Sequence, residues 1–178
     1  MKKFLAVFTV FVYLVPAALY AINKYNEYHG FSSSLTFFMS FVAPVMLMVI
    51  VCIMASVNII AALLSFVRSR FLSFRTILVF KLLLVPFYAV NFVFWLFLST
   101  FFFTAFFTWP LLPFIISYTY FTLLGTSAFN IVKLIKLCAD KKIPVKKAVV
   151  HSLLQLVFVL DMASTIYLSV KQEKLETM

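Results

Sequence analysis

Residues 35–67 have the sequence LTFFMSFVAPVMLMVIVCIMASVNIIAALLSFV, in which no side chain is charged. An α-helix rises about 1.5 Å per residue, so a helix over this stretch would be about 50 Å long. The hydrocarbon core of a bilayer is only about 30 Å thick. The stretch therefore predicts one long transmembrane helix that is tilted or kinked at Pro44.

The whole chain has the composition of a protein whose main solvent is lipid. Hydrophobic residues make up 65% of its 178 residues and charged residues only 11%, whereas average globular domains have about 45–50% and about 25%. This composition excludes a disordered chain, a coiled coil and a disulfide-rich scaffold. About 20 apolar residues cross a bilayer once, so the length leaves room for roughly five spans and no separate soluble domain.

We expect an all-α transmembrane helical bundle that forms one integral membrane domain over residues 1–178. Five spans are predicted at about residues 4–22, 35–67, 76–108, 111–137 and 148–170. The apolar block of residues 76–130 must cross twice. Pro110 and Pro113 mark the reversal beside Trp109, because proline breaks helices and Trp favours the membrane interface.

The first apolar run follows Lys2 and Lys3, and a secretory signal peptide also begins with basic residues before an apolar stretch. We favour a retained helix. The run of about 19 residues is longer than the usual signal core, and the candidate cleavage site Leu19-Tyr20-Ala21 lacks a small residue at its first position.

Positively charged segments alternate along the chain with neutral ones. The net charge is +2 before the first span, +3 between the second and third, and +5 between the fourth and fifth, while the other loops and the tail are neutral. Under the positive-inside rule this pattern places the N-terminus in the cytoplasm and the C-terminus outside.

The formal net charge of +10 would suggest nucleic acid as a partner for a soluble protein, but the basic residues here lie in short loops beside apolar runs. We expect them to contact the anionic headgroups of the lipid bilayer, and we expect no nucleic acid. The expected headgroup contacts are Arg68, Arg70, Arg75, Lys133, Lys136, Lys141, Lys142, Lys146 and Lys147.

Polar side chains form a stripe on four of the predicted spans, and each stripe should face the bundle interior because the bilayer core holds no water. The stripe occupies an arc of about 80° around the helix axis on the second, third and fourth spans, and an arc of about 120° on the fifth. The stripes are Ala55, Asn58, Ala62 and Ser65; Lys81, Tyr88, Asn91, Trp95 and Ser99; Thr119, Thr122, Thr126, Asn130 and Lys133; and His151, Gln155, Asp161, Thr165 and Ser169.

These stripes are either helix-packing seams or the lining of a ligand or ion pathway. The candidate packing seam is Ala55, Asn58, Ala62, Ser65, Thr122, Thr126, Asn130 and Gln155. The candidate polar core or ion site is Asp161, Asn91, Lys81 and Thr119.

Asp161 is the only acidic side chain in any predicted span, and to ionise it there without a partner would cost several kcal/mol. At about 1.5 Å per residue from the nearest basic loop, Asp161 and Asn91 lie about 21–24 Å deep and Lys81 about 12 Å shallower than Asp161. We therefore predict a contact between Asp161 and Asn91, with the carboxyl at least partly protonated, while Lys81 can snorkel to the surface. The carboxyl is either structural or a proton or cation site.

The chain has few residues that could act as catalytic groups or metal ligands. Its two histidines, His29 and His151, lie on opposite sides of the membrane in this topology, and the sequence has no HExxH, no GxSxG and no paired carboxylates. Metal sites and hydrolytic sites need such sets. We therefore expect no enzyme activity, no catalytic residues, no metal and no cofactor.

Three segments carry a resemblance. They are Lys81-Leu82-Leu83-Leu84-Val85-Pro86-Phe87 with Asn91-Phe92, Leu123-Leu124-Gly125-Thr126-Ser127 with Asn130, and His151 with Gln155 and Val157-Phe158-Val159-Leu160-Asp161. Together they resemble an uncharacterised family of small multi-spanning bacterial membrane proteins. The resemblance covers at most half of the chain. It implies a bacterial cytoplasmic membrane and a shared bundle, and it assigns no role to any residue.

We expect a non-enzymatic integral membrane protein, a small subunit or accessory protein that packs against other transmembrane helices or against a second copy of itself. The alternative is a small transporter, channel or proton-coupled permease centred on Asp161 and Asn91. An enzyme acting on lipid ranks third. A water-filled cavity that reaches Asp161 would favour transport, whereas a closed interior with an exposed small-residue seam would favour the packing subunit.

Overall fold

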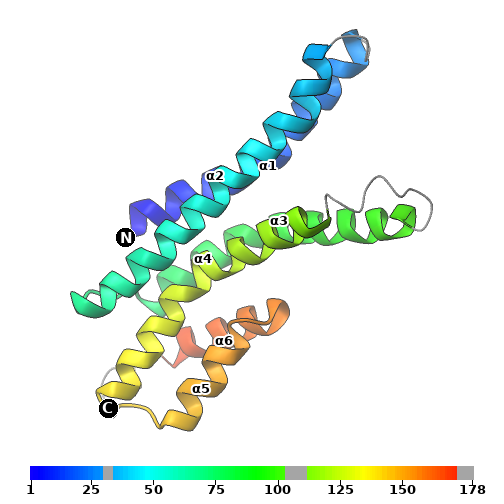
Figure 1. Ribbon diagram of the computed structural model, residues 1–178. Helices are drawn as coiled ribbons and strands as arrows, with labels where there is room; N and C mark the ends of the chain where they lie inside the picture. Colours follow the sequence, from blue (N-terminus) through cyan, green and yellow to red (C-terminus); the bar gives the residue numbers. More distant parts are fainter. Residues whose placement is uncertain (30–33, 103–111, 172–178) are drawn as a thin grey trace.

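The computed structural model describes residues 1–29, 34–102 and 112–171, and this part of the chain contains helices and short connections but no strand (Figure 1). The helices are α1 (Lys2–His29), α2 (Ser34–Val67), α3 (Phe74–Phe102), α4 (Leu112–Ala139), α5 (Val145–Leu154) and α6 (Phe158–Val170). The predicted all-α class is confirmed. The reversal predicted at Trp109 and Pro110 lies outside the described residues, as do the side chains of Trp95 and Ser99.

Four of the described helices are long and apolar enough to cross a membrane. Their apolar segments are Lys2–Ile22, Val45–Val67, Phe74–Val93 and Ile116–Ala139. These segments fall within the first four predicted spans or differ from them by two residues at an end. Much of their apolar surface is not packed within the chain, since Val10, Ile53 and Val93 are 59%, 57% and 64% exposed. Lipid or other apolar helices would cover such a surface.

The basic ends of α1 to α4 meet at one end of the bundle. Leu5 near the start of α1, Ala62 near the end of α2, Ile77 near the start of α3 and Phe129 of α4 are buried in one apolar cluster. Successive helices therefore run in opposite directions, as Figure 1 shows for α1 and α2. This arrangement places the three basic segments of the sequence at the same end of the structure.

Small residues let α2 and α4 approach each other closely. Gly125 of α4 faces Ala55 of α2, and a Cβ atom at Gly125 would lie 3.2 Å from the Ala55 Cα and Cβ atoms and from Phe8 Cζ. The predicted seam residues of α2 (Ala55, Asn58, Ala62 and Ser65) are all buried. The seam is thus used inside the bundle and is not exposed to a partner.

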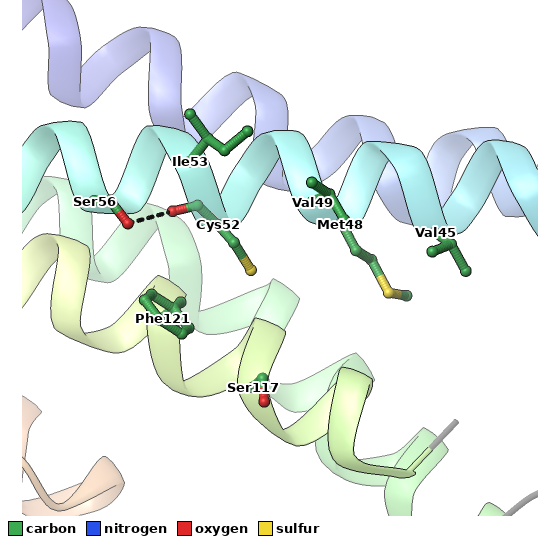
Figure 2. Close-up of a pocket in the computed structure, with 8 residues that line it drawn as sticks. All are labelled: Val45, Met48, Val49, Cys52, Ile53, Ser56, Ser117 and Phe121. Carbon is green, nitrogen blue, oxygen red and sulfur yellow. Dashed lines mark hydrogen bonds between the residues drawn. The ribbon is translucent and has the colours of Figure 1, made fainter. Parts of the chain in front are cut away.

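Farther from the basic end, an apolar cleft of about 220 Å³ opens between α2 and α4 (Figure 2). Cys52 and Met48 of α2 and Phe121 of α4 line it, and Ser56 Oγ donates a hydrogen bond of 3.0 Å to the Cys52 carbonyl oxygen. The described residues that line the cleft include no histidine, lysine or carboxylate. Cys52 therefore has no base beside it that could activate a thiolate.

The helices α2 and α4 end in the same type of turn. The N–H of Arg70 bonds to the carbonyl of Ser65 at 3.2 Å, and the N–H of Lys142 bonds to the carbonyl of Leu137 at 2.9 Å. The preceding residues, Ser69 and Lys141, have positive φ angles of 50° and 57°. These features define the Schellman motif, in which that position is usually Gly because a Cβ atom is strained there.

Replacing Ser69 by Gly is expected to raise the free energy of unfolding by about 0.5–1 kcal/mol, because Gly adopts the left-handed conformation without strain. Reversible unfolding by SDS in mixed detergent micelles measures this difference. Ser69→Ala keeps the Cβ atom and should give no gain. An equal gain for both variants would show that the strain is not its cause.

The segment predicted as a fifth span is not one helix. α5 ends at Leu154 and α6 begins at Phe158, and Val157 between them has extended backbone angles (φ −107°, ψ 120°). The chain reverses there, so α5 and α6 form a helical hairpin beside α4 (Figure 1). The prediction of a single helix over residues 148–170 is therefore wrong.

The two ends of the hairpin lie together. The ring of His151 on α5 stacks on the ring of Tyr167 on α6 with a centroid distance of 5.1 Å, and the ammonium groups of Lys147 and Lys171 lie 5.6 Å and 4.5 Å from the Tyr167 centroid. In a single helix Lys147 and Lys171 would be about 36 Å apart. The chain thus returns at Lys171 to the end of the hairpin where α5 begins, and not to the far end expected of a single helix.

The reversal has a physical reason in the polar residues of the two arms. A straight helix would spread the side chains from His151 to Thr165 over about 21 Å of bilayer depth, and each would need its own partner away from water. The hairpin instead brings both arms to one buried cluster.

Candidate functional site

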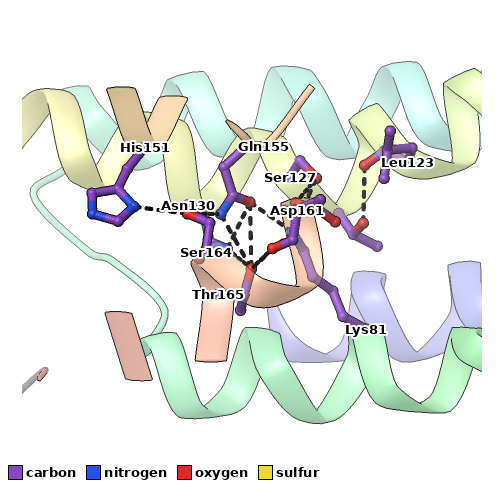
Figure 3. Close-up of polar contacts among 10 residues, drawn as sticks. Lys81, Leu123, Ser127, Asn130, His151, Gln155, Asp161, Ser164 and Thr165 are labelled. Carbon is purple, nitrogen blue, oxygen red and sulfur yellow. Dashed lines mark hydrogen bonds and ion pairs between the residues drawn. The ribbon is translucent and has the colours of Figure 1, made fainter. Parts of the chain in front are cut away.

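An ion pair lies where α3, α4 and the hairpin meet. The ammonium of Lys81 on α3 contacts the carboxylate of Asp161 on α6, and the two side chains are only 1% and 2% exposed (Figure 3). An unpaired charge buried to this degree would cost several kcal/mol. Each of the two residues therefore supplies the partner that the other needs.

Three further side chains place oxygen acceptors around the Lys81 ammonium. Nζ lies 3.0 Å from Ser127 Oγ, 2.6 Å from Gln155 Oε1 and 3.2 Å from Thr165 Oγ1. The Asp161 carboxylate also accepts a hydrogen bond of 2.9 Å from Ser127 Oγ. Side chains thus replace water around the pair.

Asn130 of α4 connects the pair to both arms of the hairpin. Its Nδ2 donates to Gln155 Oε1 at 3.0 Å and to Thr165 Oγ1 at 2.9 Å. Gln155 is the first residue of the turn, and the Tyr120 hydroxyl donates to the carbonyl of the next residue, Leu156, at 3.3 Å. The turn is therefore held to α4 on both sides. We call the buried residues Lys81, Ser127, Asn130, Gln155, Asp161 and Thr165 the ionic cluster.

The predicted contact between Asp161 and Asn91 is wrong. Asn91 Nδ2 donates instead to Thr119 Oγ1 at 2.6 Å, between α3 and α4. A depth counted along a straight helix from Lys147 places Asp161 too deep, because the hairpin turn brings it back to the level of Lys81. Because Asp161 lies at its level, Lys81 pairs with Asp161 instead of snorkelling to the surface, and its ammonium is buried.

Asn91 and Thr119 belong to a second place in the bundle. Asn91 lines a largely apolar cavity of about 590 Å³ between α1, α2, α3 and α4, together with Pro16 and Tyr118. The Tyr118 hydroxyl donates to the Val12 carbonyl at 3.0 Å. The four residues predicted as one polar core therefore form two separate pairs, Lys81 with Asp161 and Asn91 with Thr119.

The predicted seam residues have different partners. Thr122 and Thr126 are buried on α4 but donate to carbonyls of their own helix, at Tyr118 and Leu123, over 2.8 Å and 3.0 Å. Asn130 and Gln155, predicted as part of the packing seam, belong to the ionic cluster. Asn58 is buried on α2, and its Nδ2 has no hydrogen-bond partner within the described part of the chain.

The sequence-based site omitted Ser127 and Ser164, and it placed Thr165 on the polar stripe of the fifth span without assigning it to the polar core. Ser127 lies about 100° around the helix from Thr126 and so falls off the stripe of α4. Thr165 lies one turn after Asp161, and this spacing put both residues on one stripe. Ser164 Oγ lies 3.1 Å from Gln155 Nε2 and 3.0 Å from His151 Nδ1, which extends the ionic cluster to the half-buried His151.

The basic residues predicted at the lipid headgroups differ in exposure. Arg68, Arg70, Arg75, Lys141 and Lys146 are exposed, and Lys136, Lys142 and Lys147 are half-buried. Lys133 is buried, and its ammonium lies 4.2 Å from the centroid of the Phe74 ring. Lys133 therefore packs inside the bundle. Among residues 1–29, 34–102 and 112–171 no group of three His, Cys, Asp or Glu side chains could hold a metal ion.

These features define a helical protein with four apolar helices long enough to cross a membrane and a hairpin that is held by a buried ion pair. The chain belongs to a family of unknown function, DUF6652, whose model matches residues 1–174. This finding confirms the resemblance to an uncharacterised family. No curated protein and no solved structure matches the chain.

Proposed function

We propose that the chain is an integral membrane protein in which α1 to α4 cross the bilayer and the α5–α6 hairpin enters from the cytoplasmic side and returns to it. The arms of 10 and 13 residues are too short to span but suit a re-entrant segment. The irregular backbone at the turn is supported by protein contacts from Tyr120, as a re-entrant segment requires. The basic residues at the shared end support a cytoplasmic position in a bacterial cytoplasmic membrane.

This topology is testable with single cysteines in a variant that lacks Cys52 and Cys138. Lys146→Cys and Lys171→Cys are both expected to react with a membrane-impermeant maleimide from the cytoplasmic side only. Tyr28→Cys, an exposed position at the other end of α1, is the control and should react only from the opposite side. If Lys171→Cys reacts from the same side as Tyr28→Cys, the hairpin crosses the membrane and the topology is wrong.

Within the membrane the protein acts as a non-enzymatic small subunit or accessory protein that packs against other transmembrane helices. This proposal rests on the closed ionic cluster and on the exposed apolar surface, because the small-residue seam of α2 is buried inside the bundle. The two charges of the ionic cluster are 1% and 2% exposed and its members hydrogen-bond to one another, so the strongest polar groups are used to hold the fold. The surface left for contact is apolar, with Ile53 and Leu63 of α2 and Phe92 of α3 more than half exposed.

Purification from native membranes in mild detergent, after cross-linking and with mass spectrometry of what copurifies, tests this role. The expected result is a stoichiometric membrane-protein partner or a homo-oligomer. A monomer without a partner would contradict it.

A proton or cation carrier is the second candidate, because hydrogen bonds lead from the buried pair toward the basic end. They run from Lys81 to Gln155 and through Ser164 to the half-buried His151. Chains of this kind occur in proton relays. Proteoliposomes with an imposed pH gradient would show proton flux that is lost in Asp161→Asn and kept in Asp140→Asn, an exposed carboxyl. Equal flux in the wild-type protein and in empty vesicles would contradict this candidate.

A further inference from the structure

A groove runs along the outside of α1 and α2 at the basic end. It has a volume of about 450 Å³ and is lined by apolar side chains of both helices, among them Phe4, Ile60 and Leu64. These three side chains are 58%, 55% and 47% exposed. From Val57 to Leu64 the apolar lining follows α2 for about 10 Å.

Two arginines close the groove at its end. Arg68 and Arg70 both line it and both are exposed. Ser69 between them is the left-handed residue of the Schellman turn (φ 50°), so the backbone of the two arginines is fixed by the hydrogen bond from Arg70 to Ser65. Neither guanidinium forms an ion pair with a carboxylate in the described part of the chain. Two such groups at one place favour a phosphate, which guanidinium binds in a bidentate manner.

We propose that this groove is a binding site for one anionic phospholipid, with the phosphate between Arg68 and Arg70 and an acyl chain along Phe4, Ile60 and Leu64. The inference rests on the proposed membrane location and deepens it, because it separates one specific lipid from the general attraction of basic loops to anionic lipid. A soluble phosphate would match the arginines but leave the apolar lining exposed to water. Both halves of the groove thus fit a phospholipid.

Native mass spectrometry of the full-length protein in detergent, titrated with phosphatidylglycerol or phosphatidylcholine, tests the headgroup part. Phosphatidylglycerol is expected to bind tighter, and Arg68→Gln/Arg70→Gln should weaken its binding about tenfold or more. The control Lys141→Gln/Lys146→Gln removes the same charge from exposed lysines at the same end and should change binding less than twofold. Equal losses in the two double variants would show general electrostatic attraction and would overturn the site.

The acyl-chain part needs a second variant. Ile60→Trp fills the groove and should weaken phosphatidylglycerol binding at least fivefold, whereas Val79→Trp, at an exposed apolar position of α3, should leave it unchanged. Glycerophosphoglycerol, which is phosphatidylglycerol without its acyl chains, should not compete at millimolar concentration. Full binding in Ile60→Trp, or competition by glycerophosphoglycerol, would contradict a lipid in the groove.

Alkaline extraction of membranes tests the membrane location separately from the lipid site. If the chain stays in the membrane fraction after alkaline extraction but binds both lipids equally, the groove site fails and the membrane location stands. If the extracted chain is soluble, the membrane location fails as well.

Discussion

Asp161→Asn is expected to lower the free energy of unfolding by about 3–5 kcal/mol, because it breaks a buried ion pair. The amide has nearly the shape of the carboxylate, so packing is kept, but the Lys81 ammonium loses its counter-charge in a place where it is 1% exposed. Lys81 must then either stay charged without a partner or give up its proton, and both states cost free energy. SDS-induced unfolding in mixed micelles measures the loss.

A double variant separates the loss of the pair from the loss of packing. Lys81→Met/Asp161→Leu removes both charges and keeps apolar volume, and its stability should recover by at least half of the loss in Asp161→Asn. Asp140→Asn is the matched control, because Asp140 pairs with Lys136 at the surface at 3.1 Å with 31% and 40% of the two side chains exposed. It should change the unfolding free energy by less than about 1 kcal/mol. A loss in Asp161→Asn no larger than that would show that the pair does not hold the hairpin.

Gly125→Val is expected to lower the free energy of unfolding by about 2–3 kcal/mol. A Cβ atom at this position would lie 3.2 Å from Ala55 Cα, a backbone atom that can move only if α2 moves. The two additional methyl groups of Val increase the overlap, and overpacking of this kind exceeds the helix propensity that is gained by replacing Gly.

Ser117→Val is the matched control for that substitution. Ser117 is also on α4 but is exposed and faces the open cleft beside Cys52 (Figure 2). Its replacement should change stability by less than about 0.5 kcal/mol. If Gly125→Val and Ser117→Val lower the free energy of unfolding equally, the contact between α2 and α4 is not as close as Gly125 and Ala55 indicate.

The sequence predicted the four long helices because their signal is simple. A run of about 20 apolar residues has few structures available to it other than a membrane helix or a fully buried one, and residues 4–22 and 35–67 contain no charge at all. The common position of the basic segments followed from their alternation with neutral loops. The apolar runs and the alternating basic segments can both be found from composition and spacing alone, without knowing how the helices pack.

The hairpin was not predictable in the same way, because its turn contains neither Gly nor Pro. Residues 155–157 are Gln, Leu and Val, and nothing in them breaks a helix. The signal lies in the polar residues around the turn. His151, Gln155, Asp161 and Thr165 are spaced by four, six and four residues, and the step of six interrupts a helical period that the steps of four keep.

The error at the turn also caused the error in the partner of Asp161. A straight helix places Asp161 beside Asn91 in depth, while the hairpin places it beside Lys81. The rule that a buried carboxylate needs an opposite charge favours the observed pair, but the depth count ranked Asn91 ahead of Lys81. The members of the ionic cluster come from α3, α4, α6 and the hairpin turn, and their convergence depends on how these elements pack.

The most direct measurement is a chemical cross-link between positions 151 and 164, one on each side of the hairpin turn. In the structure His151 Nδ1 and Ser164 Oγ are 3.0 Å apart, whereas in a continuous helix these positions would be about 20 Å apart. A short membrane-permeant reagent that joins two thiols therefore distinguishes the two arrangements. His151→Cys/Ser164→Cys without Cys52 and Cys138 should form an intramolecular cross-link in native membranes, seen as a linked peptide by mass spectrometry, and His151→Cys/Ala163→Cys should form less. If both thiols of the first variant react with the reagent but no linked peptide forms, the result contradicts the hairpin and the ionic cluster that it completes.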